Sequence, residues 1–259
     1  MLDHAVLPGA LRDFGQSSLA AALIGAYLVF GEPFVGVALH RAFERAVAHD
    51  RKARRWLYSR ILILEWVLAI LCIVTILLAQ HVTLEAIGLR WPRGITGWSI
   101  TLGSLLIGLL VLALTQRGAI RLRSMAPGQA IKALGGQSVV AMLPRTAAER
   151  QWFGAVSVTA GICEEIAYRG FLLAVIAAIA PGFPVVVAAV VAVVGFGVAH
   201  AYQGPQGIVG TMVIGAVLAA LYLTTWSLIA PMILHALIDL RAVPLGRILA
   251  PSTRSRHRR

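Results

Sequence analysis

Long runs of apolar residues, separated by short polar stretches, fill most of this chain. A helix needs about 20 apolar residues to cross the roughly 30 Å hydrocarbon layer of a membrane. Seven runs approach or reach that length, at approximately 17–38, 57–79, 97–115, 152–178, 184–202, 207–223 and 227–243. The pattern predicts an all-α, polytopic transmembrane helix bundle with about seven spans.

Several segments depart from a plain apolar span. The first run contains Gly31-Glu32-Pro33, which predicts a kink or a split. The run 152–178 is long enough to tilt or to continue beyond the bilayer. The stretch 82–92 is amphipathic and too short to span, so we expect a surface helix or a turn. Glycines and a proline in 116–151 predict a connection with short helical pieces.

Basic residues give the orientation. They gather in 39–56, in 116–151 and in the C-terminal tail, whereas 80–96 has only Arg90 and Arg93. Seven spans would put the three basic segments on one side, which the positive-inside rule makes the cytoplasm. We therefore expect a multi-pass protein of a bacterial inner membrane, with a cytoplasmic C-terminus.

Composition excludes two other classes of protein. Hydrophobic residues make up 59% of the 259 residues and charged residues only 13%, too few to cover a soluble domain of this length. The net charge of +12 would suggest a nucleic-acid partner, but no reader motif accompanies it. We expect three parts: N-terminal spans with basic loops in 1–150, a catalytic helix bundle in 151–245 and a basic tail in 246–259.

Ionisable residues within the apolar runs are the candidates for chemistry, because a charge at membrane depth costs about 3 kcal/mol or more. Six of the eight fall between residues 164 and 239, which favours one shared site there. The eight are Glu32, Glu65, Glu164, Glu165, Arg169, His200, His235 and Asp239.

On a helix, Glu165 and Arg169 are four residues apart and share a face, which favours an ion pair. Glu164 points about 100° away and lacks that partner, so it is a candidate general base or acid. The alternative is a structural ion pair with one further acid that binds a neighbouring helix.

The two histidines each have a structural alternative as well. His200 follows Phe196 by four residues and could simply cap a helix at the cytoplasmic end. His235 and Asp239 are also four apart and could form a self-satisfied polar pair. Taken together, however, a Glu/His pair can hold and deprotonate a water molecule while a second histidine stabilises the oxyanion. The same set could instead hold a divalent metal such as zinc, with Glu164, His200 and His235 as ligands.

These residues resemble the CPBP family of intramembrane proteases, also called the CAAX protease and bacteriocin-processing (Abi) family, which is related to the Rce1-type prenyl-protein endopeptidases. The family is marked by Glu-Glu-x-x-x-Arg, Phe-x-x-x-His and His-x-x-x-Asn or Asp. Here the three motifs occupy 164–169, 196–200 and 235–239. The resemblance covers about residues 150–243.

The resemblance implies a role for each matching position. Glu164 would activate water together with His200, His235 and Asp239 would lie on the oxyanion side, and Glu165 and Arg169 would support the site. The family is often described as metalloproteases, and a metal-free glutamate mechanism is the alternative. The expected partners are the lipid bilayer and a membrane protein or lipid-anchored peptide as substrate.

A non-enzymatic membrane carrier or scaffold is the competing hypothesis. Glu32 and Glu65 lie in the first two spans and would suit a proton-coupled pathway, whereas the protease interpretation gives them no role. The break at Gly31-Glu32-Pro33 is also typical of transporter helices, although no matching break is visible later in the sequence.

Overall fold

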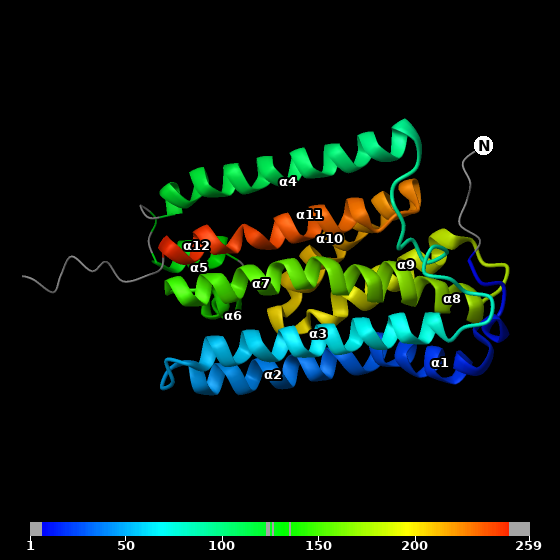
Figure 1. Cartoon of the computed structure of the whole chain (residues 1–259). Coiled ribbons are helices and arrows are strands. Elements are labelled where there is room, and N and C mark those ends of the chain that lie inside the picture. Colours follow the sequence, from blue (N-terminus) through cyan, green and yellow to red (C-terminus); the bar gives the residue numbers. More distant parts are fainter. Residues whose placement is uncertain (1–6, 123–124, 126, 135, 249–259) are drawn as a thin grey trace, which may run out of the picture.

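The computed structural model describes residues 7–122, 125, 127–134 and 136–248. Within these residues the chain is helical and contains no strand, so the predicted all-α class is confirmed. The helices run roughly parallel or antiparallel to one long axis (Figure 1). The first elements are η1 (Leu11–Ser17), α1 (Ser18–Ala26), η2 (Tyr27–Gly31), α2 (Glu32–Val47), α3 (Ala53–Leu77), α4 (Gly94–Leu122), α5 (Pro127–Ala133) and α6 (Gln137–Met142).

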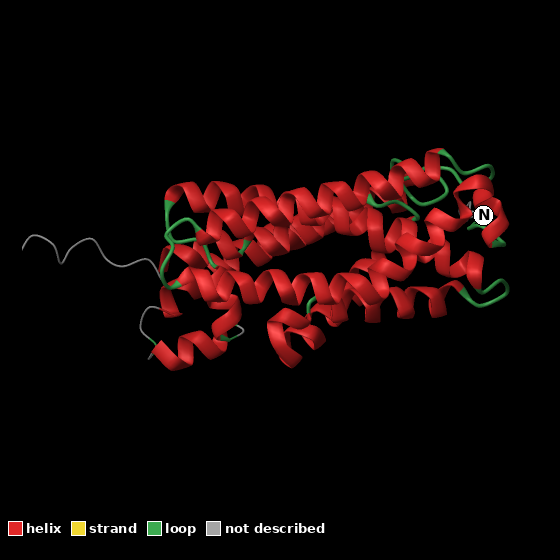
Figure 2. Ribbon diagram, turned by 90° about the horizontal axis from the view of Figure 1, so that it is seen from below, coloured by secondary structure: helices red, strands yellow, loops and turns green. Residues whose placement is uncertain are grey.

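The second half contains the long rod in which α7 (Ala147–Glu164), η3 (Glu165–Leu172) and α8 (Leu173–Ile179) follow one another without a break. The remaining elements are α9 (Val185–Ala199), η4 (Ala201–Gln203), α10 (Gly204–Thr225), α11 (Ile229–Leu240) and α12 (Ala242–Ile248). Figure 2 shows the same helical composition from a second direction.

Five helical segments are long and apolar enough to cross a membrane: Leu11–Val47, Ala53–Leu77, Gly94–Ala119, Ala201–Thr225 and Ile229–Gly246. The α7–η3–α8 rod and the shorter apolar α9 account for the other two predicted spans. The chain is therefore a multi-pass integral membrane protein with about seven helical segments.

The two ends of the bundle differ in charge and in aromatic residues. The turn between α2 and α3, together with α5, α6 and α12, lies at one end, and η1, the 78–93 connection and the start of α9 lie at the other (Figure 1). Two of the predicted basic segments thus share an end, and the basic tail beyond residue 248 lies outside the described residues. Exposed Trp91 and Trp98 stack at the opposite end, as expected for an interfacial aromatic belt.

Three boundaries differ from the sequence-based expectation. The predicted loop 39–56 is mostly helix, because α2 continues to Val47 by burying Phe43 against α3, and only residues 48–52 form a turn. The first span does not split at Gly31-Glu32-Pro33. A π-helical turn, η2, precedes Glu32, and Pro33 falls in the first turn of α2, where its missing N–H costs nothing.

The 82–92 connection is a turn, as one of the two predicted alternatives had it, and it is packed into the core at some positions while Glu85 and Trp91 are exposed. Val82 and Ile87 are buried in the main core, and the Gly88 carbonyl accepts a hydrogen bond from the Leu228 amide at 2.8 Å. Gly88 has a φ of 88°, a conformation that favours glycine. Arg90 donates to the Trp226 carbonyl at 2.7 Å, so this turn ties the first half of the chain to the α10–α11 connection.

The start of α7 is encoded locally. Thr146 accepts a hydrogen bond from the Glu149 amide, and the Glu149 carboxylate accepts one from the Thr146 amide, which together form a capping box. From this fixed start, α7 places Glu164 at its last residue, well inside the bundle, where α3 and α11 pack against the rod.

Candidate active site

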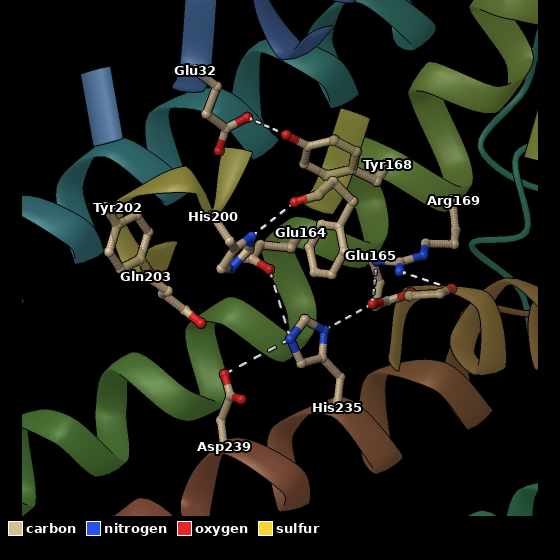
Figure 3. A network of polar contacts seen from close by, with 12 residues as sticks. Glu32, Glu164, Glu165, Tyr168, Arg169, His200, Tyr202, Gln203, His235 and Asp239 are labelled. Carbon is tan, nitrogen blue, oxygen red and sulfur yellow. Dashed lines mark hydrogen bonds and ion pairs between the residues drawn. The ribbon is translucent and has the colours of Figure 1, made fainter. Parts of the chain in front are cut away.

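The ion pair predicted between Glu165 and Arg169 is present and fully buried. The Arg169 Nη1 atom donates to Glu165 Oε1 at 2.8 Å, and the two side chains are 2% and 0% exposed. Arg169 Nη2 also donates to the Gly215 carbonyl on α10 at 3.2 Å, and the guanidinium carbon lies 4.3 Å from the centre of the Phe196 ring. The pair therefore joins η3 to both α9 and α10 (Figure 3).

His235 binds a different partner from the one that its spacing suggested. Its Nδ1 lies 2.8 Å from Glu165 Oε1, whereas Nε2 lies 3.6 Å from Glu164 Oε2 and 3.7 Å from Asp239 Oδ2 (Figure 3). The spacing allowed a hydrogen bond between His235 and Asp239; in the structure the two residues form a longer pair, and the hydrogen bond of His235 is made with Glu165 because α11 packs directly on the rod. Asp239 remains 38% exposed.

Gly161 permits that packing. A methyl group added there would lie 2.7 Å from the Ala236 amide nitrogen, and backbone cannot easily move away. The absence of a side chain at Gly161 thus lets α11 approach α7 closely enough for His235 to reach both glutamates.

His200 follows the last residue of α9, and that helix is shorter than predicted. The expected span 184–202 is realised as 15 residues, which rise about 22 Å, less than the roughly 30 Å hydrocarbon layer. His200 is the C-cap residue of α9, as the structural alternative had it, and it lies inside the bundle beside Glu164 (Figure 3).

Phe196 holds both histidines. Its ring makes edge contacts with His200 and His235 at centroid distances of 4.8 and 5.8 Å, and its carbonyl oxygen lies 2.9 Å from His200 Nδ1. The sequence marked Phe196 as the first position of the Phe-x-x-x-His motif and as a residue on the same face as His200, but it assigned no role to the ring.

The contacts of Nδ1 determine which ring nitrogen donates a hydrogen bond in each histidine. A carbonyl oxygen and an ionised carboxylate only accept hydrogen bonds, so Nδ1 is the donor in His200 and in His235. In each ring the Nε2 atom is then the nitrogen that remains for a water molecule or a substrate.

Two cavities meet at this site. One, of about 120 Å³, lies among α2, α3 and η4, and the other, of about 260 Å³, extends among α6, α7, α10 and α11. Glu164 and His200 line both, whereas His235 and Asp239 line only the second. Glu164 Oε2 is shielded from solvent and has no hydrogen-bond partner, so a polar atom in the cavity could bind there.

Glu32 and Glu65 also belong to this region, which corrects the expectation that they are separate from it. Glu32 lines the smaller cavity and accepts a hydrogen bond at 2.7 Å from Tyr168, a residue inside the first motif. Glu65 lines both cavities. Their positions depend on how α2 and α3 pack against the rod, and no local motif marks them.

Metal binding can be tested against the donor set. Across the described part of the chain, no three His, Cys, Asp or Glu side chains form a group that could hold a metal ion. Glu165 occupies Nδ1 of His235, and the Nε2 atom faces two carboxylates at 3.6 and 3.7 Å. The predicted metal-ligand set of Glu164, His200 and His235 remains a prediction.

Comparison with known families bears on the same residues. Residues 147–241 match the family model described as type II CAAX prenyl endopeptidase Rce1-like. These residues form an Rce1-like segment. It begins at the first residue of α7 and ends just after α11, so it contains all six predicted site residues and none of α1–α4.

The Rce1-like match confirms the resemblance drawn from the three motifs and indicates a membrane protease. No curated protein matches the chain. No solved structure matches it either.

Proposed function

We propose that the chain is an intramembrane endopeptidase that hydrolyses a peptide bond of a membrane protein or a lipid-anchored peptide. The observation that carries the proposal is the Oε2 atom of Glu164, which makes no hydrogen bond, lies 3.6 Å from His235 Nε2 and is buried at the junction of two cavities beside His200. A carboxylate so placed is suited to binding and deprotonating a water molecule.

The first step is the activation of that water. Glu164 accepts one of its protons, and His200, whose Nδ1 donates to the Phe196 carbonyl, presents Nε2 as a further acceptor for that same proton. The O–H bond breaks as the water oxygen adds to the substrate carbonyl. The site lies among apolar helices, where each fixed charge acts more strongly than in water.

The second step concerns the carbonyl oxygen, which becomes an oxyanion. His235 would stabilise it through Nε2–H, with Nδ1–H held by Glu165 and with Asp239 orienting the ring at 3.7 Å. Arg169 supports this arrangement through its bond to Glu165. The proton taken from water then passes to the departing nitrogen, the C–N bond breaks, and a carboxylate and an amine result.

The experiment compares the membrane proteomes of cells that carry the wild-type chain or the Glu164→Gln variant. We expect at least one precursor to accumulate in the variant. Glu85→Gln, which changes an exposed carboxylate outside both cavities, is the matched control. Equal precursor levels in all three strains would contradict the proposal.

Purified protein distinguishes the two versions of the mechanism. Cleavage that persists in the presence of a chelator would support water activation by Glu164 and His200 alone. Cleavage that is lost on chelation and restored by zinc would require a metal-bound water in its place.

A proton-linked carrier is the second candidate, and one observation favours it. Glu32, Glu65 and Glu164 line one cavity, and π-helical turns interrupt both the first helix and the rod, at η2 and η3. A proton flux in reconstituted vesicles that depends on Glu65, together with no proteolysis, would support the carrier.

We propose the orientation from the basic end of the bundle and the positive-inside rule: the α2–α3 turn and the α4–α7 connection lie in the cytoplasm, in a bacterial inner membrane. Labelling of a cysteine introduced at Lys52 should therefore require a membrane-permeant reagent.

A further inference from the structure

Glu65 occupies the middle of α3, outside the Rce1-like segment. The face of α3 that lines the smaller cavity also contains Leu57, Ile61, Leu64 and Leu68, at the spacing of one helical stripe. The opposite face, with Val67 and Ile70 half exposed, is turned toward lipid. Glu65 is the only acidic residue of α3. Because it lines the cavities, it points into the bundle.

Four polar side chains line both cavities, and Glu65 is one of them; the others are Glu164, His200 and Tyr202. Glu65 therefore borders the place where Glu164 and His200 meet the cavity space. Its Oε2 atom is shielded from solvent and has no hydrogen-bond partner, which is also true of Glu164 Oε2. Two unpartnered carboxylate oxygens beside the same space are costly unless a polar molecule fills it.

Glu32 provides a useful contrast. It lines only the smaller cavity, and its Oε2 atom already accepts a hydrogen bond from the Tyr168 hydroxyl. Glu65, unlike Glu32, has a carboxylate oxygen available at the junction.

We propose that Glu65 is a further catalytic residue, which accepts the second hydrogen of the water that Glu164 deprotonates. This inference rests on the proposed protease function. A water molecule held by one acceptor can rotate, whereas two acceptors fix its lone pair toward the substrate carbonyl. One O–H bond breaks, with its proton going to Glu164, and the other stays intact and donates to Glu65 throughout the addition.

The test uses purified protein in detergent and a library of proteome-derived peptides, with cleavage read by mass spectrometry. One cleaved peptide is then made as a fluorogenic substrate. Glu65→Leu removes both acceptor oxygens, and we expect kcat to fall about 100-fold with KM unchanged. Glu65→Gln keeps one acceptor oxygen and should lose about tenfold, so the order of activity is Glu, Gln, Leu.

Val67→Ala is the matched control on α3, because Val67 is 50% exposed and outside both cavities. If Glu65→Leu does not fold, the kcat of Glu65→Gln decides the question. A kcat within twofold of wild type for Glu65→Gln and Glu65→Leu, or a change confined to KM, would overturn the role of Glu65 while leaving the protease intact. Wild-type protein that cleaves no peptide, like Glu164→Gln, would instead contradict the proposed function.

Discussion

The helices of the Rce1-like segment and the helix α4 are all rich in apolar residues, but their polar side chains and exposed faces have different surroundings. In α7, η3, α9 and α11, polar side chains face inward and bond to one another. In α4, large apolar side chains such as Leu102, Leu106 and Leu110 are more than half exposed and meet lipid. Hydropathy alone therefore does not distinguish a helix that forms the site from one that only borders it.

Replacing an arginine gives the largest expected difference in stability between the interior and the periphery of the bundle. Arg169→Gln leaves Glu165 as a buried carboxylate without its cation, which should lower the free energy of unfolding by about 3 kcal/mol. Arg93→Gln removes an exposed pair with Glu85, in the connection that precedes α4, and should cost less than about 1 kcal/mol. Thermal or denaturant unfolding in detergent measures both, and equal losses would contradict the comparison.

Replacing a glycine gives the next largest expected difference, in both stability and cleavage. Gly161→Ala places a methyl group against the Ala236 backbone, so α11 must shift, at a cost of about 1–3 kcal/mol. Peptide cleavage should fall with stability, because His235 moves away from the glutamates. Gly103→Ala in α4 meets nothing within 4 Å and should be neutral or slightly stabilising. A loss of activity in Gly103→Ala would show that α4 does more than border the bundle.

Replacing a phenylalanine gives the smallest expected difference, which is one of kcat. Phe196→Leu removes the edge contacts with both histidines, worth about 1 kcal/mol, and should lower kcat about fivefold. Phe30→Leu changes a ring that is 70% exposed to lipid and should leave kcat unchanged. Equal kcat values for the two variants would show that the Phe196 ring does not contribute to catalysis.

The sequence was sufficient to predict the helical class, the seven apolar segments and the gathering of Glu164, Glu165, Arg169, His200 and His235. Local spacing was enough for this, because a charge in an apolar run must find a partner. The Glu165–Arg169 pair, four residues apart on one helix, depends on no tertiary packing for its existence.

Other features depended on contacts between distant helices. The choice of Glu165 over Asp239 as the partner of His235 follows from the close approach at Gly161, which spacing within α11 cannot reveal. The inward direction of Glu65 was encoded in the stripe that contains Leu57, Ile61 and Leu68, but its meeting with Glu164 required the packing of α3 on α7. The end of α9 at Ala199 was missed because the predicted span was extended past His200 to residue 202.

The π-helical segment η3 has a consequence for how the chain tolerates change. A π turn holds about one residue more than an α turn, and each residue of an α-helix turns the chain by about 100°. Deleting one residue between Arg169 and Leu172 would convert the π turn to α geometry, and the helices on either side would keep their relative orientation. Deleting one residue from α7 would instead rotate Glu164 by that angle against the helices that pack on it, so a search of natural variants should find gaps in α7 far less often than substitutions.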